Sequence, residues 1–281
     1  MRRSLVLMAA IAMAALALPR PAAARFWDEV QTPSPGPAQS IGGSGAGCLA
    51  GGIALPADGI GYLAVRLSRR RYFGHPETVA FVERLGRADA AADLPPFYVG
   101  DMAQPRGGPL PSMHVSHQSG VDVDIWFNLD PKPNLAPASR ENVDLPSMIL
   151  PDASAIDPSR FGARQVQLLR LAASDPLVDR IFVHWTIKRA LCQGYGRAAD
   201  HAWLHRLRPW YGHDDHFHVR LACPPDSPQC TGQPPIPAGD GCDASLDWWF
   251  HQPPPVPSAS PAPPPRQRPL PAACSAVEAA N

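Results

Sequence analysis

The pattern of hydrophobic and polar positions predicts four strands and three helices. The strand segments alternate in polarity and are rich in β-branched and aromatic residues. They are PPFYVGDMA (95–103), GVDVDIWF (120–127), DRIFVHW (179–185) and HFHVRLA (216–222). Three other segments have apolar residues at helical spacing. They are PETVAFVERLGRA (76–88), ARQVQLLRLAAS (163–174) and DHAWLHRL (200–207).

These elements follow one another without a regular βαβ rhythm, which favours an α+β fold. We expect a small, mostly antiparallel central sheet, flanked by helices and long loops. Because the strands carry their polar residues on one face, the sheet is expected to hold the functional site on that face.

The first residues carry a different pattern, which is that of an export signal. A basic pair precedes an apolar run over residues 5–18, and small residues follow at Ala22 and Ala24. The run is too short to span a bilayer comfortably, and a signal peptidase requires small residues at its cleavage site. We expect residues 1–24 to be a signal peptide and the exported, soluble chain to begin near Arg25. An uncleaved anchor is the alternative.

Proline and glycine are concentrated in two segments. Residues 32–47 (TPSPGPAQSIGGSGAG) have the composition of turns and linkers, and residues 251–271 hold ten prolines in a polyproline-like stretch that cannot pack a core. We expect one domain over residues 25–250 and a Pro-rich tail over residues 251–281. Cys274 lies beyond the prolines and is expected to tether this tail to the domain.

Charge and cysteine content narrow the class of protein. The chain has 25 Lys and Arg and 25 Asp and Glu. No basic stripe is interleaved with aromatic residues, which argues against nucleic acid or an anionic membrane as partner. An even number of cysteines in an exported chain predicts disulfides, and no pair has the C-x-x-C spacing of a zinc site. Spacing leaves the pairing of the six open: Cys48, Cys192, Cys223, Cys230, Cys242 and Cys274.

The densest cluster of chemical groups lies in GHDDHFHVRLAC, residues 212–223. In a strand, His216, His218 and Arg220 share one face, opposite an apolar face that can pack on the core. Asp215 is a candidate second base. By strand alternation, however, it is expected to face away from the two histidines and to be a turn or surface acid.

A second cluster lies about a hundred residues upstream, in SMHVSHQSGVDVDIWF (112–127). Asp122 and Asp124 lie opposite an apolar face of the predicted strand. The QSG turn can bring His117 over the same face as Asp124, and His114 lies just before it. Asp122 is the alternative carboxylate if the turn differs.

Together the two segments offer the ligands of a metal site. Zinc takes nitrogen and oxygen donors, and a catalytic zinc keeps an open position for water. His117, Asp124 and His218 supply such a set. His216 and His213 then stay available for proton transfer.

Several long motifs of the chain resemble those of the penicillin-insensitive murein endopeptidases. These are zinc peptidases related to lysostaphin-type enzymes and D-Ala-D-Ala peptidases. The resemblance runs through most of the predicted domain and includes all six cysteines. The motifs are SMHVSHQSGVDVD (112–124), LRLAASDPLVDRIFV (169–183), RPWYGH (208–213), GHDDHFHVRLACP (212–224) and GDGC (239–242).

The resemblance assigns roles to the residues already singled out. It implies metal ligands at His117, Asp124 and His218. His114 is a further motif histidine beside the metal, and His216 and His213 match positions that assist catalysis. The implied disulfides are Cys48–Cys274, Cys192–Cys242 and Cys223–Cys230.

The implied protein is a periplasmic, zinc-dependent endopeptidase that cleaves D-alanyl–meso-diaminopimelyl cross-links between peptidoglycan stem peptides and is insensitive to penicillin. No S-x-x-K signature of a serine enzyme is present. Two alternatives stay open. The first is a non-catalytic periplasmic protein that binds metal or cell wall, with His114 as a fourth ligand, and the second is a D,D-carboxypeptidase. Arg208 and Arg220 are candidates for a substrate carboxylate or for structural ion pairs.

Overall fold

The computed structural model describes residues 27–111, 115–132, 136–252 and 268–280. The predicted signal peptide, residues 1–24, lies outside the described residues. No helix in the described part of the chain combines the length and the hydrophobicity needed to cross a bilayer.

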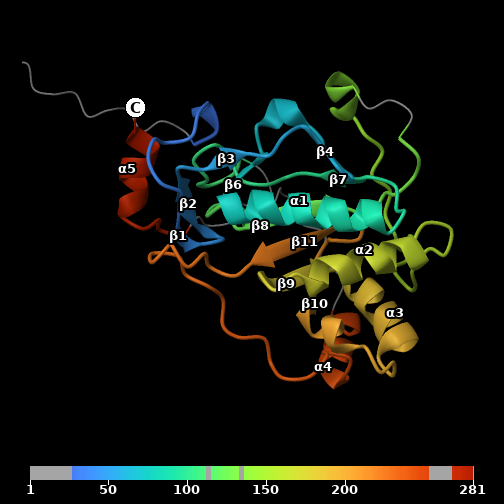
Figure 1. Cartoon of the computed structure of the whole chain (residues 1–281). Coiled ribbons are helices and arrows are strands. Elements are labelled where there is room, and N and C mark those ends of the chain that lie inside the picture. Colours follow the sequence, from blue (N-terminus) through green and yellow to red (C-terminus); the bar gives the residue numbers. More distant parts are fainter. Residues whose placement is uncertain (1–26, 112–114, 133–135, 253–267, 281) are drawn as a thin grey trace, which may run out of the picture.

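The described residues form five α-helices and several short strands (Figure 1). The helices are α1 (Pro76–Ala91), α2 (Ala163–Ser174), α3 (Trp185–Tyr195), α4 (Ala244–Asp247) and α5 (Ala273–Ala279). The strands are β1 (Gln39–Gly43), β2 (Ala46–Ala50), β3 (Ile53–Ala54), β4 (Asp58–Gly59), β5 (Tyr62–Ala64), β6 (Phe73–Gly74), β7 (Phe97–Val99), β8 (Asp122–Trp126), β9 (Val178–Val183), β10 (Leu207–Pro209) and β11 (His216–Leu221). Single 3-10 turns lie at Trp27–Glu29, Leu67–Arg69, Pro137–Arg140, Ala202–Arg206 and Trp248–Phe250.

The central sheet has the strand order β10-β9-β11-β8-β7-β5-β4. The pairs β10–β9 and β5–β7 are parallel, and the other neighbours are antiparallel. Figure 1 shows α1 and α2 side by side in front of this sheet. The predicted α+β fold with a mostly antiparallel sheet is therefore confirmed.

The apolar faces of the two central strands build the core. Val123 and Ile125 of β8 and Phe217 and Val219 of β11 are fully buried, in one cluster with the apolar faces of α1 and α2. Each such side chain stabilises the fold by about 1.5–3 kcal/mol relative to an exposed one. Since strand side chains alternate, the polar residues between them project to the opposite face of the sheet.

Two segments near α3 differ from the predicted elements. Residues 200–207 form only the 3-10 turn Ala202–Arg206, because β10 begins at Leu207 and leaves no room for a regular helix. The helix α3, missed in the sequence, begins directly after β9. His184 caps it by accepting a hydrogen bond from the Thr186 N–H at 3.1 Å. Histidine is a weak cap signal, so the pattern gave no helix start here.

The segment predicted as a linker, residues 32–47, instead contributes to a hairpin of β1 and β2. Its glycines serve close packing rather than flexibility. A Cβ atom at Gly47 would overlap the carbonyl oxygens of Ile41 and Gly43 across the hairpin. Gly42 has a φ of 71°, which glycine adopts without strain. The segment was expected to be turn and linker: the turn is present at residues 44–45, but the linker part of the prediction was wrong, because composition alone does not separate the two uses of glycine.

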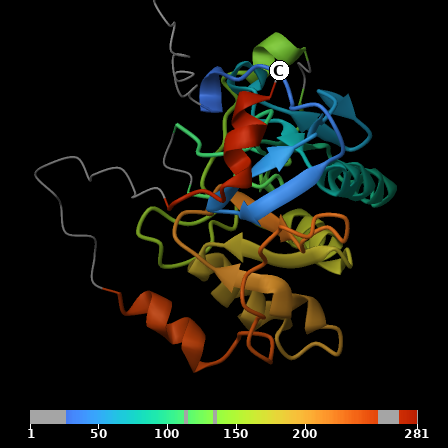
Figure 2. The same cartoon turned by 90° about the vertical axis from the view of Figure 1, so that its left-hand side faces the viewer.

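The C-terminal helix α5 packs against this hairpin, and Figure 2 shows the two side by side. Cys48 of β2 is bonded to Cys274 of α5 across 226 residues. The other disulfides join Cys192 to Cys242 and Cys223 to Cys230. These are the pairs that the family resemblance implies, and the first brings residues 268–280 onto the domain.

An acidic residue buried in α1 predicts a pH-dependent stability. Asp89 is 0% exposed, and its carboxyl oxygens have no hydrogen-bond partner among the described residues. Burial raises the pKa of Asp89 from 3.8 to about 7, although Lys132 nearby lowers it in part. The folded protein thus retains a proton that the unfolded chain releases, so stability falls as the pH rises from about 4 to about 7.

Asp89→Asn removes this ionisation and is expected to stabilise the fold by about 1–3 kcal/mol at pH 8. The gain should shrink towards pH 4, where Asp89 is already protonated in the folded wild-type protein. Urea unfolding of both proteins between pH 4 and pH 8 measures it. The exposed Asp93→Asn is the matched control. A gain that does not change with pH would contradict the buried charge as its cause.

Candidate metal centre and catalytic groups

The register of β8 and β11 brings the two predicted clusters together. The strands are antiparallel, with His218 opposite Asp124 and Arg220 opposite Asp122. The polar side chains of both strands therefore project from the same face of the sheet. The Nδ1 atom of His218 lies 3.1 Å from Asp124 Oδ1.

The loop before β8 adds the third donor. His117 has a left-handed backbone with a φ of 65°, which is uncommon for a residue other than glycine. Its N–H donates to Asp122 Oδ2 at 3.0 Å, and this hydrogen bond holds the turn. As a result, the Nε2 atom of His117 lies 3.3 Å from Asp124 Oδ2.

The three side chains form a group that could hold a metal ion. One potential ligand atom from each of His117, Asp124 and His218 lies within 4.8 Å of the other two. The residues are 0%, 1% and 4% exposed, respectively. Two imidazoles and one carboxylate are a donor set that suits zinc and leaves a coordination position open. The residues present therefore fit a catalytic zinc ion. His114, the further predicted metal neighbour, lies outside the described residues.

Asp122 is not in the group of three donors, but it forms hydrogen bonds with two of them. Its carboxylate accepts hydrogen bonds from the Ser44 hydroxyl, the His117 N–H, His218 Nε2 at 2.9 Å and Arg220 Nε at 2.7 Å. Burial alone would raise the pKa of Asp122. The Arg220 guanidinium and the His218 imidazole outweigh burial and hold this pKa well below its usual range. The carboxylate fixes His218 by one ring nitrogen, so the other ring nitrogen faces Asp124.

His216 carries a carboxylate partner of its own. Its Nδ1 lies 2.5 Å from Asp215 Oδ1, and its Nε2 lies 3.8 Å from Asp124 Oδ1. Because an ionised carboxylate only accepts, Nδ1 carries a proton, and Nε2 beside Asp124 is the ring atom that can take up or release a second one. Burial lowers the pKa of His216, but Asp124 and Asp215 outweigh it and raise this pKa above its usual value. The expectation that Asp215 faces away was wrong. Strand alternation does not apply to it, since β11 begins at His216.

His213 lies beside both histidines of the strand. Its ring centroid is 4.9 Å from that of His216 and 5.8 Å from that of His218. Burial, together with charge on the two neighbouring imidazoles, lowers the pKa of His213 to about 3. Its Nδ1 hydrogen-bonds the Tyr211 carbonyl at 2.6 Å and therefore carries the proton. His213 is thus a neutral imidazole whose Nε2 can accept a hydrogen bond.

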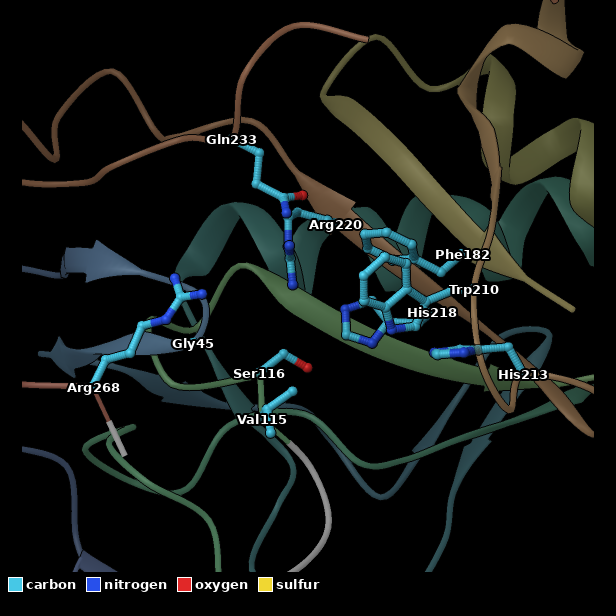
Figure 3. Close-up of a pocket in the computed structure, with 10 residues that line it drawn as sticks. All are labelled: Gly45, Val115, Ser116, Phe182, Trp210, His213, His218, Arg220, Gln233 and Arg268. Carbon is cyan, nitrogen blue, oxygen red and sulfur yellow. The ribbon is translucent and has the colours of Figure 1, made fainter. Parts of the chain in front are cut away.

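A cleft of about 430 Å³ opens over this group (Figure 3). His213, His218 and Arg220 line it, whereas Arg208 does not. Several other residues that were not singled out as site residues also line the cleft, and they come from separate loops and strands. They are Gly45, Val115, Ser116, Phe182, Trp210, Gln233 and Arg268.

The aromatic run at residues 248–250 lies near one side of the cleft. Trp249 packs against Trp185 and Tyr211, with ring centroids 5.7 Å and 5.2 Å apart, and contacts Trp210. Trp249 thus extends an aromatic cluster that begins at the cleft with Trp210.

The group at His218 thus has the composition of a metal-dependent hydrolase site: two imidazoles and a carboxylate, beside a carboxylate-bound imidazole that can carry a proton. Comparison of the sequence with known families identifies one such group of enzymes. The profile of the penicillin-insensitive murein endopeptidases, a metallopeptidase family, matches residues 40–279, and the chain belongs to this family.

Several curated bacterial proteins of this description are similar along most of their length. The penicillin-insensitive murein endopeptidase of Haemophilus influenzae is 44% identical over 239 residues, which cover 83% of this chain and 82% of that protein. The protein of Yersinia enterocolitica is 41% identical over 268 residues, with 94% of each chain covered. That of Yersinia pestis is 41% identical over 255 residues, covering 91% and 90%.

Proposed function

We propose that this protein is a zinc-dependent murein endopeptidase that hydrolyses D-alanyl–meso-diaminopimelyl cross-links of peptidoglycan. One observation carries the proposal. His117, Asp124 and His218, of which His218 lines the cleft, converge next to the pair His216–Asp215. Membership of the murein endopeptidase family supports the substrate class.

The chain's own residues divide the chemistry between them. A bound zinc ion would act as a Lewis acid and lower the pKa of water at its open position. His216 accepts a proton at Nε2, while Asp215 holds its Nδ1–H and fixes the tautomer. His213 presents a neutral imidazole to the same space. This chemistry requires no serine nucleophile, which agrees with insensitivity to penicillin.

The proposed location is the periplasm. The three disulfides support an oxidising compartment, and peptidoglycan is reached from that side of the membrane. We keep the boundaries predicted from the sequence: a signal at residues 1–24, the peptidase domain at 25–250 and the tethered tail at 251–281. The proposed partners are the cross-linked stem peptides.

Metal removal on a defined substrate tests the function. Chelator-treated protein is expected to cleave cross-linked muropeptide dimers at least 100-fold more slowly, and added zinc should restore the rate. Chromatography of the products distinguishes dimer cleavage from release of terminal D-alanine. Full activity of the metal-free protein would refute the proposal. Release of D-alanine alone would indicate a carboxypeptidase, and tight zinc binding without hydrolysis would indicate a binding protein.

A further inference from the structure

Two arginines approach the cleft beside the candidate metal centre. Figure 3 shows Arg268 on one side of the cleft and His213 on the other, with Arg220 and Ser116 between them. We propose that Arg220 and Arg268 form a subsite that binds a carboxylate of the substrate. This inference rests on the proposed function, because the carboxylate it names belongs to the stem peptide.

The space that the subsite occupies is continuous. A second cavity of about 580 Å³ adjoins the cleft and runs along the turn of β1 and β2 towards Pro269 and Pro271. The two cavities share the lining residues Gly45, Arg220, Gln233 and Arg268. A peptide chain that reaches His218 can therefore extend past both guanidinium groups.

Arg220 is held in place with part of its guanidinium available. It is 8% exposed, its Nε donates to Asp122 at 2.7 Å, and its guanidinium carbon lies 5.2 Å from the centre of the Phe182 ring. In the described part of the chain, no hydrogen bond engages its two terminal nitrogens. Since arginine has five N–H donors in a rigid fork, these nitrogens can donate to a carboxylate in the cleft.

Arg268 comes from the tail rather than from the domain. The Cys48–Cys274 disulfide holds the tail against the hairpin, where a Cβ atom added at Gly42 would lie 2.7 Å from Pro271 Cγ. Arg268 is exposed and lines both cavities, and it forms no ion pair within the described residues. A charged side chain placed at a cleft without an acidic neighbour is available to a ligand.

The positive charge of the two arginines determines which kind of ligand the subsite binds. No aspartate or glutamate is among the described residues that line either cavity, and Asp122, the partner of Arg220, is buried beneath them. The subsite therefore favours an anion. Planar guanidinium groups match the geometry of a carboxylate.

The proposed substrate carries a carboxylate in a suitable position. In a D-alanyl–diaminopimelyl cross-link, the carbon attached to the scissile nitrogen also bears a carboxylate. His218 and Arg220 are two residues apart on one strand face, or about 6–7 Å. A peptide bond over the metal ligands thus places this carboxylate within reach of Arg220, and Arg268 closes the subsite from the tail.

A pair of substrates that differ in one group tests the subsite. The first is a cross-linked dimer with this carboxylate free, and the second is the same dimer with the carboxylate amidated. Arg268→Gln is expected to raise KM for the free carboxylate about tenfold, to change kcat less than twofold, and to leave the amidated dimer unaffected. Arg268→Lys should restore part of the loss, because it keeps the charge. Arg164→Gln, an exposed arginine of α2, is the matched control.

Binding of the uncleaved monomeric peptides, free and amidated, gives a readout that does not depend on catalysis. If wild-type protein cleaves both dimers and Arg268→Gln keeps the same preference for the free carboxylate, the subsite is wrong and the proposed function stands. If wild-type protein cleaves neither dimer but Arg268→Gln abolishes a binding preference for the free carboxylate, the function fails and the anion subsite remains. Equal binding of both peptides by wild-type protein overturns the subsite.

Discussion

Replacing His216 by alanine is expected to lower kcat for cross-link cleavage by about 100- to 10,000-fold while the protein keeps its bound zinc. The side chain lies beside the group of three donors rather than inside it, with Nδ1 held by Asp215. Its loss removes a proton acceptor and leaves His117, Asp124 and His218 in place. Metal analysis of the purified variant, together with steady-state rates on muropeptide dimers, measures both effects.

The variant His218→Ala provides the contrast, because it removes one of the three proposed ligands. It is expected to lose most of its zinc and its activity together. His251→Ala, an exposed histidine that does not line the cleft, should keep both. If His216→Ala loses zinc as completely as His218→Ala, then His216 is a ligand and not a base. If it keeps its activity, it has no part in the chemistry.

The centre of the fold and the donor group could be predicted from the sequence because strand alternation is a local property. The apolar residues Val123 and Ile125 fix which way β8 faces, and Phe217 and Val219 do the same for β11. Once both strands enter one sheet, their intervening polar residues must share the opposite face. Packing thus determines much of the site before any ligand is considered.

The rest depends on contacts between distant segments, which a local pattern does not contain. The glycines of β1 and β2 make the segment look like a linker in composition. They are needed there because neighbouring backbone atoms leave no room for a Cβ atom. Asp215 reaches His216 because it precedes the strand, where a turn and not the pleat sets its direction. Arg268 follows a proline-rich segment and reaches the cleft through the tether at Cys274.

Asp122 shows most clearly how the fold supports the site, and its removal has the largest expected effect on stability. Asp122→Ala is expected to destabilise the fold by about 3–5 kcal/mol, because it leaves the buried Arg220 charge without its partner. The same change removes the acceptors of the His117 N–H and of His218 Nε2. Loss of a carboxylate behind a metal-ligating histidine typically weakens metal binding about 10- to 100-fold.

Urea unfolding in the presence of a chelator measures the loss of fold stability without any contribution from bound metal. Zinc titration of the folded variant measures the loss of metal affinity. Asp200→Ala is the control. Asp200 pairs with Arg170 at the surface, where loss of an ion pair costs less than about 1 kcal/mol. If Asp122→Ala lowers the free energy of unfolding as little as Asp200→Ala does, Arg220 finds another partner or water when Asp122 is absent. Zinc affinity equal to that of the wild-type protein would show that the position of His218 is set by the strand register and not by its hydrogen bond to Asp122.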